Sequence, residues 1–166
     1  VYTNHVFVLN GSTGAVLPGW TYDNNPVRDI VRQNQISGQD TRVIIPVPAV
    51  GDMDGDDSLE IAACFDYKVY LWNSDGSLVD GYPVQMMHYT GFYLSPLIAD
   101  VDGDAEQELV VTSRDGTIYA FNYDGTPATG FPVATPYAIN STPCIADLDN
   151  DGRNELTVVS GTKAYC

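Results

Sequence analysis

Short apolar runs, separated by turns rich in Asp, Asn and Gly, recur along the whole sequence. Leu109-Val110-Val111 is followed by a turn at Asp115-Gly116 and then by the alternating run Ile118–Phe121. Asp-Gly between apolar runs is a strong hairpin signal because both residues tolerate positive φ. A second turn, at Asp124-Gly125, leads to a short strand that ends at Gly130-Phe131-Pro132. The pattern predicts an all-β chain built from four-stranded antiparallel units.

This unit is repeated. A four-stranded unit of about 40–50 residues is typical of a β-propeller blade, so we expect about three blades. An insertion at residues 21–42 separates the first two copies. Within it, Asn25-Pro26 followed by Val27, Ile30 and Val31 predicts a short capped helix. Aligning the copies divides the single repeat domain, residues 1–166, into the second half of a blade (1–20), an insertion (21–42), two complete units (43–90 and 91–138) and the first half of a blade (139–166).

A nine-residue acidic loop stands at the same place in each unit, after a small apolar strand such as Leu97–Ala99. Carboxylates occupy positions 1, 3, 5 and 9 of every loop, and the backbone carbonyl at position 7 can supply another oxygen. Calcium takes about 6–8 oxygen ligands, and a turn with carboxylates on alternate residues can wrap such an ion. We therefore predict three calcium ions per chain, held by Asp52, Asp54, Asp56, Ser58 and Glu60, by Asp100, Asp102, Asp104, Glu106 and Glu108, and by Asp147, Asp149, Asp151, Arg153 and Glu155, with Ser58, Glu106 and Arg153 binding through their backbone carbonyls.

Three alternative interpretations of the loop are weaker. The helix-loop-helix calcium loop needs Glu at position 12, where this chain has Ala63, Val111 and Val158. Magnesium prefers fewer protein ligands and retained waters. A solvated acidic turn without a metal would bring carboxylates together at a cost of about 3 kcal/mol per pair, and the pattern occurs three times in register.

The charge of the chain narrows the classes of partner. The sequence has 22 acidic and 7 basic residues, a formal net charge of −15. Nucleic acids and anionic membranes need a basic surface, so the charge argues against both as partners and for metal cations or basic partners. No apolar run is long enough for a membrane span. The three cysteines leave at least one thiol unpaired, and the apolar runs around Cys64 and Cys144 predict small buried side chains.

The acidic loops resemble the calcium-binding FG-GAP or VCBS type of repeat, which is found in the integrin α-subunit propeller and in many secreted bacterial proteins. The endings Gly81-Tyr82-Pro83 and Gly130-Phe131-Pro132 add to the resemblance, whereas Gly19-Trp20 is followed by Thr21 instead of proline. The resemblance implies a β-propeller with calcium in the hairpin between the first two strands of each blade. It also implies a secreted or cell-surface setting and a role in adhesion or in binding a protein or carbohydrate ligand on the cell surface or matrix.

A non-catalytic binding module is the favoured function, because neither His5 nor His88 lies in a recognisable nucleophile motif. One alternative is a structural subunit of an extracellular oligomer or fibre, formed by self-association. Another is the propeller part of a polysaccharide-acting enzyme.

The two ends of the chain are complementary halves of a blade, and a ring of three blades is below the usual four or more. We therefore expect the half-blades to be completed by another chain or by residues outside this sequence.

Overall fold

The computed structural model describes residues 6–20, 46–65, 68–86 and 94–166. The predicted insertion and both histidines lie outside these ranges. The described residues form antiparallel strands: β1 (Ala49–Gly51), β2 (Glu60–Phe65), β3 (Lys68–Trp72), β4 (Val84–Gln85), β5 (Leu97–Ala99), β6 (Glu108–Thr112), β7 (Thr117–Phe121), β8 (Val133–Ala134), β9 (Cys144–Ala146), β10 (Glu155–Ser160) and β11 (Lys163–Tyr165).

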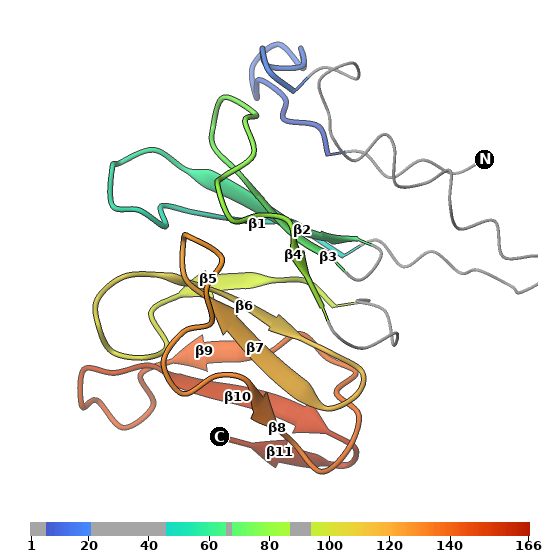
Figure 1. The fold of residues 1–166 in the computed structure, drawn as a ribbon, viewed down its shortest axis with the longest axis vertical. Helices are drawn as coiled ribbons and strands as arrows, with labels where there is room; N and C mark the ends of the chain where they lie inside the picture. Colours follow the sequence, from blue (N-terminus) through green and yellow to red (C-terminus); the bar gives the residue numbers. More distant parts are fainter. Residues whose placement is uncertain (1–5, 21–45, 66–67, 87–93) are drawn as a thin grey trace, which may run out of the picture.

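The strands form three sheets, with orders β1-β2-β3-β4, β5-β6-β7-β8 and β11-β10-β9. All their pairings are antiparallel, and the all-β prediction with blade-like units is confirmed. The sheets follow one another in sequence order from the N-terminal to the C-terminal end of the molecule (Figure 1). In residues 6–20, Leu9 and Val16 form a single antiparallel bridge.

The predicted position of the fourth strand was wrong. We expected it to end at Gly130-Phe131-Pro132, but β8 lies after this segment. Pairing after the Asp-Gly turn is limited to a bridge between Phe121 and Pro127. The chain then turns, with the Phe131 amide donating to the Ala128 carbonyl at 3.1 Å. Only after this turn can Val133 pair with Ile118.

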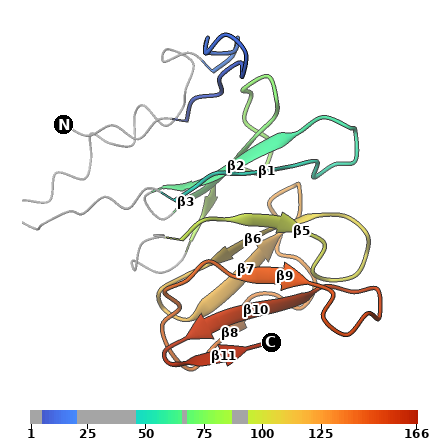
Figure 2. The same cartoon turned by 180° about the vertical axis from the view of Figure 1, so that it is seen from behind.

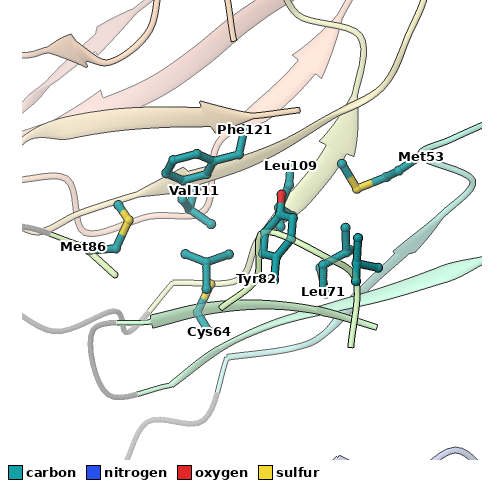
Figure 3. Close-up of a cluster of buried hydrophobic side chains, with 11 residues drawn as sticks. Met53, Cys64, Leu71, Tyr82, Met86, Leu109, Val111 and Phe121 are labelled. Atoms are coloured by element: carbon teal, nitrogen blue, oxygen red, sulfur yellow. The ribbon is translucent and has the colours of Figure 1, made fainter. Parts of the chain in front are cut away.

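The second sheet has one face packed against the first sheet and the other against the third. Small side chains of the first sheet, including Ala62 and Cys64, meet larger ones of the second, including Leu109 and Phe121. Figure 3 shows this buried cluster, with Tyr82 among its members. A similar cluster joins the second and third sheets, and another joins residues 6–20 to the first. Residues of the core therefore lie mostly between blades, as the alternation of the strands requires.

Two glycines allow neighbouring blades to approach closely. A Cβ on Gly19 would overlap the carbonyl of Asp75, and a Cβ on Gly81 would overlap the carbonyl of Asp124. The aromatic residue after each glycine donates to the same neighbouring turn. Trp20 Nε1 donates to the Ser74 carbonyl at 3.0 Å, and the Tyr82 hydroxyl donates to the Asn122 carbonyl at 2.9 Å. The endings Gly19-Trp20 and Gly81-Tyr82 are thus contacts between blades.

The C-terminal segment adds a third strand to the last sheet. Lys163–Tyr165 pairs with β10 as the beginning of a third strand. No pairing among the described residues joins residues 6–20 to residues 139–166, and these two segments lie at opposite ends of the molecule in Figure 1.

The burial prediction holds for Cys64 but is wrong for Cys144, which is exposed because it lies on the outer face of the third sheet.

Candidate metal centres

The backbone of the three acidic loops has the same unusual conformation. Positions 4 and 6 of each loop both have positive φ, between 61° and 91°. Glycine or asparagine fills position 4, as expected for the left-handed region. Position 6 is Asp57, Ala105 or Gly152. Two left-handed residues in one short loop turn the chain tightly, so that the side chains of alternate residues point toward a common centre. All three loops project from the same side of the molecule (Figure 2).

The carboxylates at positions 1, 3 and 9 come together in every loop. In each group one oxygen from each side chain lies within 4.8 Å of the other two. These groups are Asp52, Asp54 and Glu60; Asp100, Asp102 and Glu108; and Asp147, Asp149 and Glu155. The cluster in the third loop is the most exposed, whereas Glu60 and Glu108 are buried.

The position-9 glutamates are fixed by the backbone of their own loops. Glu60 accepts a hydrogen bond from the Met53 amide at 2.8 Å, and Glu108 accepts one from the Val101 amide at 2.8 Å. Glu155 accepts the equivalent bond from Leu148 at 2.7 Å. Burial, together with the nearby aspartates, raises the pKa of Glu108 to about 7 and also raises the pKa of Glu60. A buried carboxylate that is surrounded by other carboxylates is stabilised in its ionised form by a nearby positive charge.

The position-1 aspartates organise the loop. Asp100 Oδ1 accepts from the Gly103 amide at 2.7 Å, and its Oδ2 accepts from the Ala105 amide at 3.2 Å. Asp52 accepts the equivalent bonds from the Gly55 and Asp57 amides. Asp147 accepts one at Oδ2 from the Gly152 amide, at the same loop position as Ala105, and one at Oδ1 from the Asp151 amide. These bonds hold the turn closed around its centre.

The position-5 aspartates lie outside the three-carboxylate clusters. Each accepts a hydrogen bond through Oδ1 from the amide at position 7: Asp56 from Ser58 at 2.7 Å, Asp104 from Glu106 at 2.9 Å, and Asp151 from Arg153 at 2.9 Å. The second oxygen of each carboxylate is still able to bind an ion. That the backbone carbonyls at position 7 also bind the ion stays a prediction.

Asp102 provides the most specific indication of a cation site. Its Oδ2 accepts from the Thr129 amide at 3.0 Å, a contact from a distant loop that fixes the side chain. Its Oδ1 is buried and has no hydrogen-bond donor among the described residues. Buried polar atoms are nearly always paired, so this oxygen fits a bound cation. Sequence reasoning missed Thr129, because a backbone amide contributes no pattern to the sequence.

The donor set fits calcium. All the side-chain donors are carboxylate oxygens, which are hard ligands. Oxygens bound to one calcium ion at about 2.3–2.6 Å are at most about 5 Å apart, and the observed limit of 4.8 Å meets this requirement. Each cluster of three carboxylates could therefore hold one ion.

Comparison with known proteins supports the same class of repeat. The family model of the FG-GAP-like repeat matches residues 100–158, which include the second and third acidic loops. The predicted resemblance is confirmed over these residues. No curated protein gives a significant match.

Among solved structures, the chain is similar to the crystal structure of the V. cholerae biofilm matrix protein Bap1. The TM-score is 0.55 and the sequence identity is 22%, over 74% of this chain and 23% of Bap1. The chain thus spans less than a quarter of that protein's length, and the likeness is one of fold. No helix among the described residues is long and apolar enough to cross a membrane.

Proposed function

We propose that this chain is a non-catalytic, extracellular calcium-binding module for adhesion or ligand binding, in which calcium makes the blade hairpins rigid. The observation that carries the proposal is the buried Oδ1 of Asp102, which lies in a cluster of converging carboxylates and has no hydrogen-bond donor in the part of the chain that the structure describes. The likeness in fold to a biofilm matrix protein supports an extracellular setting. A protein or carbohydrate on a cell surface or matrix is the expected class of ligand.

The electrostatics of the loops supports a structural role for the ion. Ionised carboxylates whose oxygens lie within 4.8 Å of one another repel by at least about 3 kcal/mol per pair at an effective dielectric of 20. A calcium ion replaces this repulsion with attraction, and it binds the folded loop far better than the unfolded chain. At about 10 mM calcium, sites with dissociation constants of roughly 10⁻⁴–10⁻³ M would each stabilise the fold by about 1.4–2.7 kcal/mol.

The test is thermal unfolding with calcium and with a chelator. Three filled sites should raise the melting temperature by roughly 10–25 °C. Asp102→Asn keeps the size of the side chain but weakens one site, so it should remove about a third of this gain. Asp80→Asn is the matched control, because Asp80 is an exposed aspartate outside the loops. Melting curves that coincide with and without calcium, or equal effects of the two variants, would refute the proposal.

A second candidate is self-association into an oligomer or fibre. It is favoured by exposed apolar side chains at the two ends of the molecule: Phe7, Leu9 and Val16 in residues 6–20, and Val159 on the third sheet. The equivalent faces between blades are packed together. Head-to-tail contact would bury these residues in the same way. Sedimentation at increasing concentration tests this candidate: a constant monomer mass with calcium present would exclude it, and Phe7→Glu should abolish any association that is found.

A further inference from the structure

The second and third acidic loops are joined by a hydrogen bond between neighbouring blades, made by two residues 54 positions apart in sequence. Asn154 Nδ2 donates to the backbone carbonyl of Asp100 at 2.9 Å. Asp100 is the first residue of the second loop and a member of its carboxylate cluster. The loops approach closely at a second point as well, where Arg153 Nε is 3.9 Å from the position that a Cβ on Gly103 would take.

The position of Asn154 in its own loop connects this bond to the third cluster. Its neighbour Glu155 belongs to that cluster, and the carbonyl of its other neighbour, Arg153, is a predicted ligand. An ion in the third loop would therefore restrain the backbone on both sides of Asn154. The restrained amide would in turn hold the Asp100 carbonyl, and so the start of the second loop, in place before the second ion binds.

We propose that Asn154 is a positioning residue that couples calcium binding at the second and third loops, so that an ion in either loop raises the affinity of the other. The inference rests on the proposed function, because it requires both loops to bind calcium. Ordering a site in advance strengthens binding because less entropy is lost when the ligand arrives. Coupling free energies are reciprocal, so calcium in the second loop must favour the third by the same factor.

Three glycine amides provide a separate reporter for each loop. Gly55 donates to Asp52 at 2.7 Å, Gly103 to Asp100 at 2.7 Å, and Gly152 to Asp147 at 3.0 Å. Their amide signals in a calcium titration followed by NMR should give one midpoint per loop. The full 166-residue chain is used, with calcium alone as the probe.

The first comparison removes the amide group. Asn154→Ala should move the Gly103 midpoint to higher calcium by about twofold to tenfold, the equivalent of one net hydrogen bond, while Gly55 keeps its midpoint. Asn154→Leu, which retains bulk without a donor, should do the same. Gln107→Ala is the matched control, because it removes the amide at the equivalent position of the second loop. It should leave the Gly55 midpoint unchanged, since Gln107 has no side-chain hydrogen bond among the described residues.

The second comparison separates coupling from a local structural effect. Asp149→Asn weakens the third site and should raise the Gly103 midpoint in the otherwise unchanged chain. In the Asn154→Ala background the same substitution should have no further effect on Gly103. If neither substitution changes the Gly103 midpoint while all three glycines still respond to calcium, the proposed coupling is refuted but calcium binding is not. If none of the glycines responds to calcium, the proposed calcium binding itself fails.

Discussion

The contact between Gly81 and the neighbouring turn provides a sharp test of how the blades pack. Gly81 and Gly130 occupy equivalent positions and have similar backbone conformations, with φ of 92° and 85°. A Cβ on Gly81 would overlap the Asp124 carbonyl oxygen and lie 2.7 Å from its carbon, whereas a Cβ on Gly130 has nothing within 4 Å. Alanine at the two positions therefore introduces the same backbone strain but a clash at only one.

The expected magnitudes follow from these contacts. Alanine in the left-handed region costs about 1 kcal/mol, and this is the whole cost expected for Gly130→Ala. Gly81→Ala must also displace a backbone carbonyl, at about 1–3 kcal/mol. It would weaken the hydrogen bond from the adjacent Tyr82 hydroxyl, at about 1 kcal/mol. The total for Gly81→Ala is about 3–5 kcal/mol.

Urea and thermal unfolding in the same calcium buffer would measure the difference. For a chain of this length, Gly130→Ala should lower the melting temperature by about 2–4 °C and Gly81→Ala by about 8–15 °C. The matched pair removes the contribution of glycine to the unfolded state, because both variants share it. Equal losses of stability for the two variants would refute the reasoning and show that this contact between blades does not form in solution.

Two further predictions concern the second acidic loop. Ala105 has a φ of 74°, so Ala105→Gly should relieve strain and raise the free energy of unfolding by about 0.5–1 kcal/mol; a decrease in urea-unfolding experiments would contradict this. The pKa of Glu108 is raised from 4.5 to about 7 in the folded chain, so the folded state binds more protons than the unfolded state between these values. Without calcium, stability should therefore fall as the pH rises through this range, and saturating calcium should abolish the fall. A metal-free chain whose urea midpoint stays constant over this range would contradict the prediction.

Local sequence patterns determined the strands and the acidic loops. Asp-Gly turns specify the hairpins because few other residues accept positive φ, and alternation assigned the two faces of each strand. The spacing of Asp100, Asp102 and Glu108 was enough to predict that their carboxylates converge, because all three lie on one short turn. The fourth strand was misplaced because Val133-Ala134 is too short to carry an alternating pattern.

Only the tertiary structure decided how the blades and loops contact one another. Thr129 reaches Asp102 through a backbone amide, and Asn154 reaches Asp100 from another blade; neither contact has a periodic signal. The exposure of Cys144 also depends on which sheet packs against its face, so an apolar run could not reveal it. A sequence specifies local conformation through short-range sterics, whereas contacts between distant segments depend on the packing of whole sheets. That packing decides that Asp102 Oδ1 is buried without a hydrogen-bond donor among the described residues.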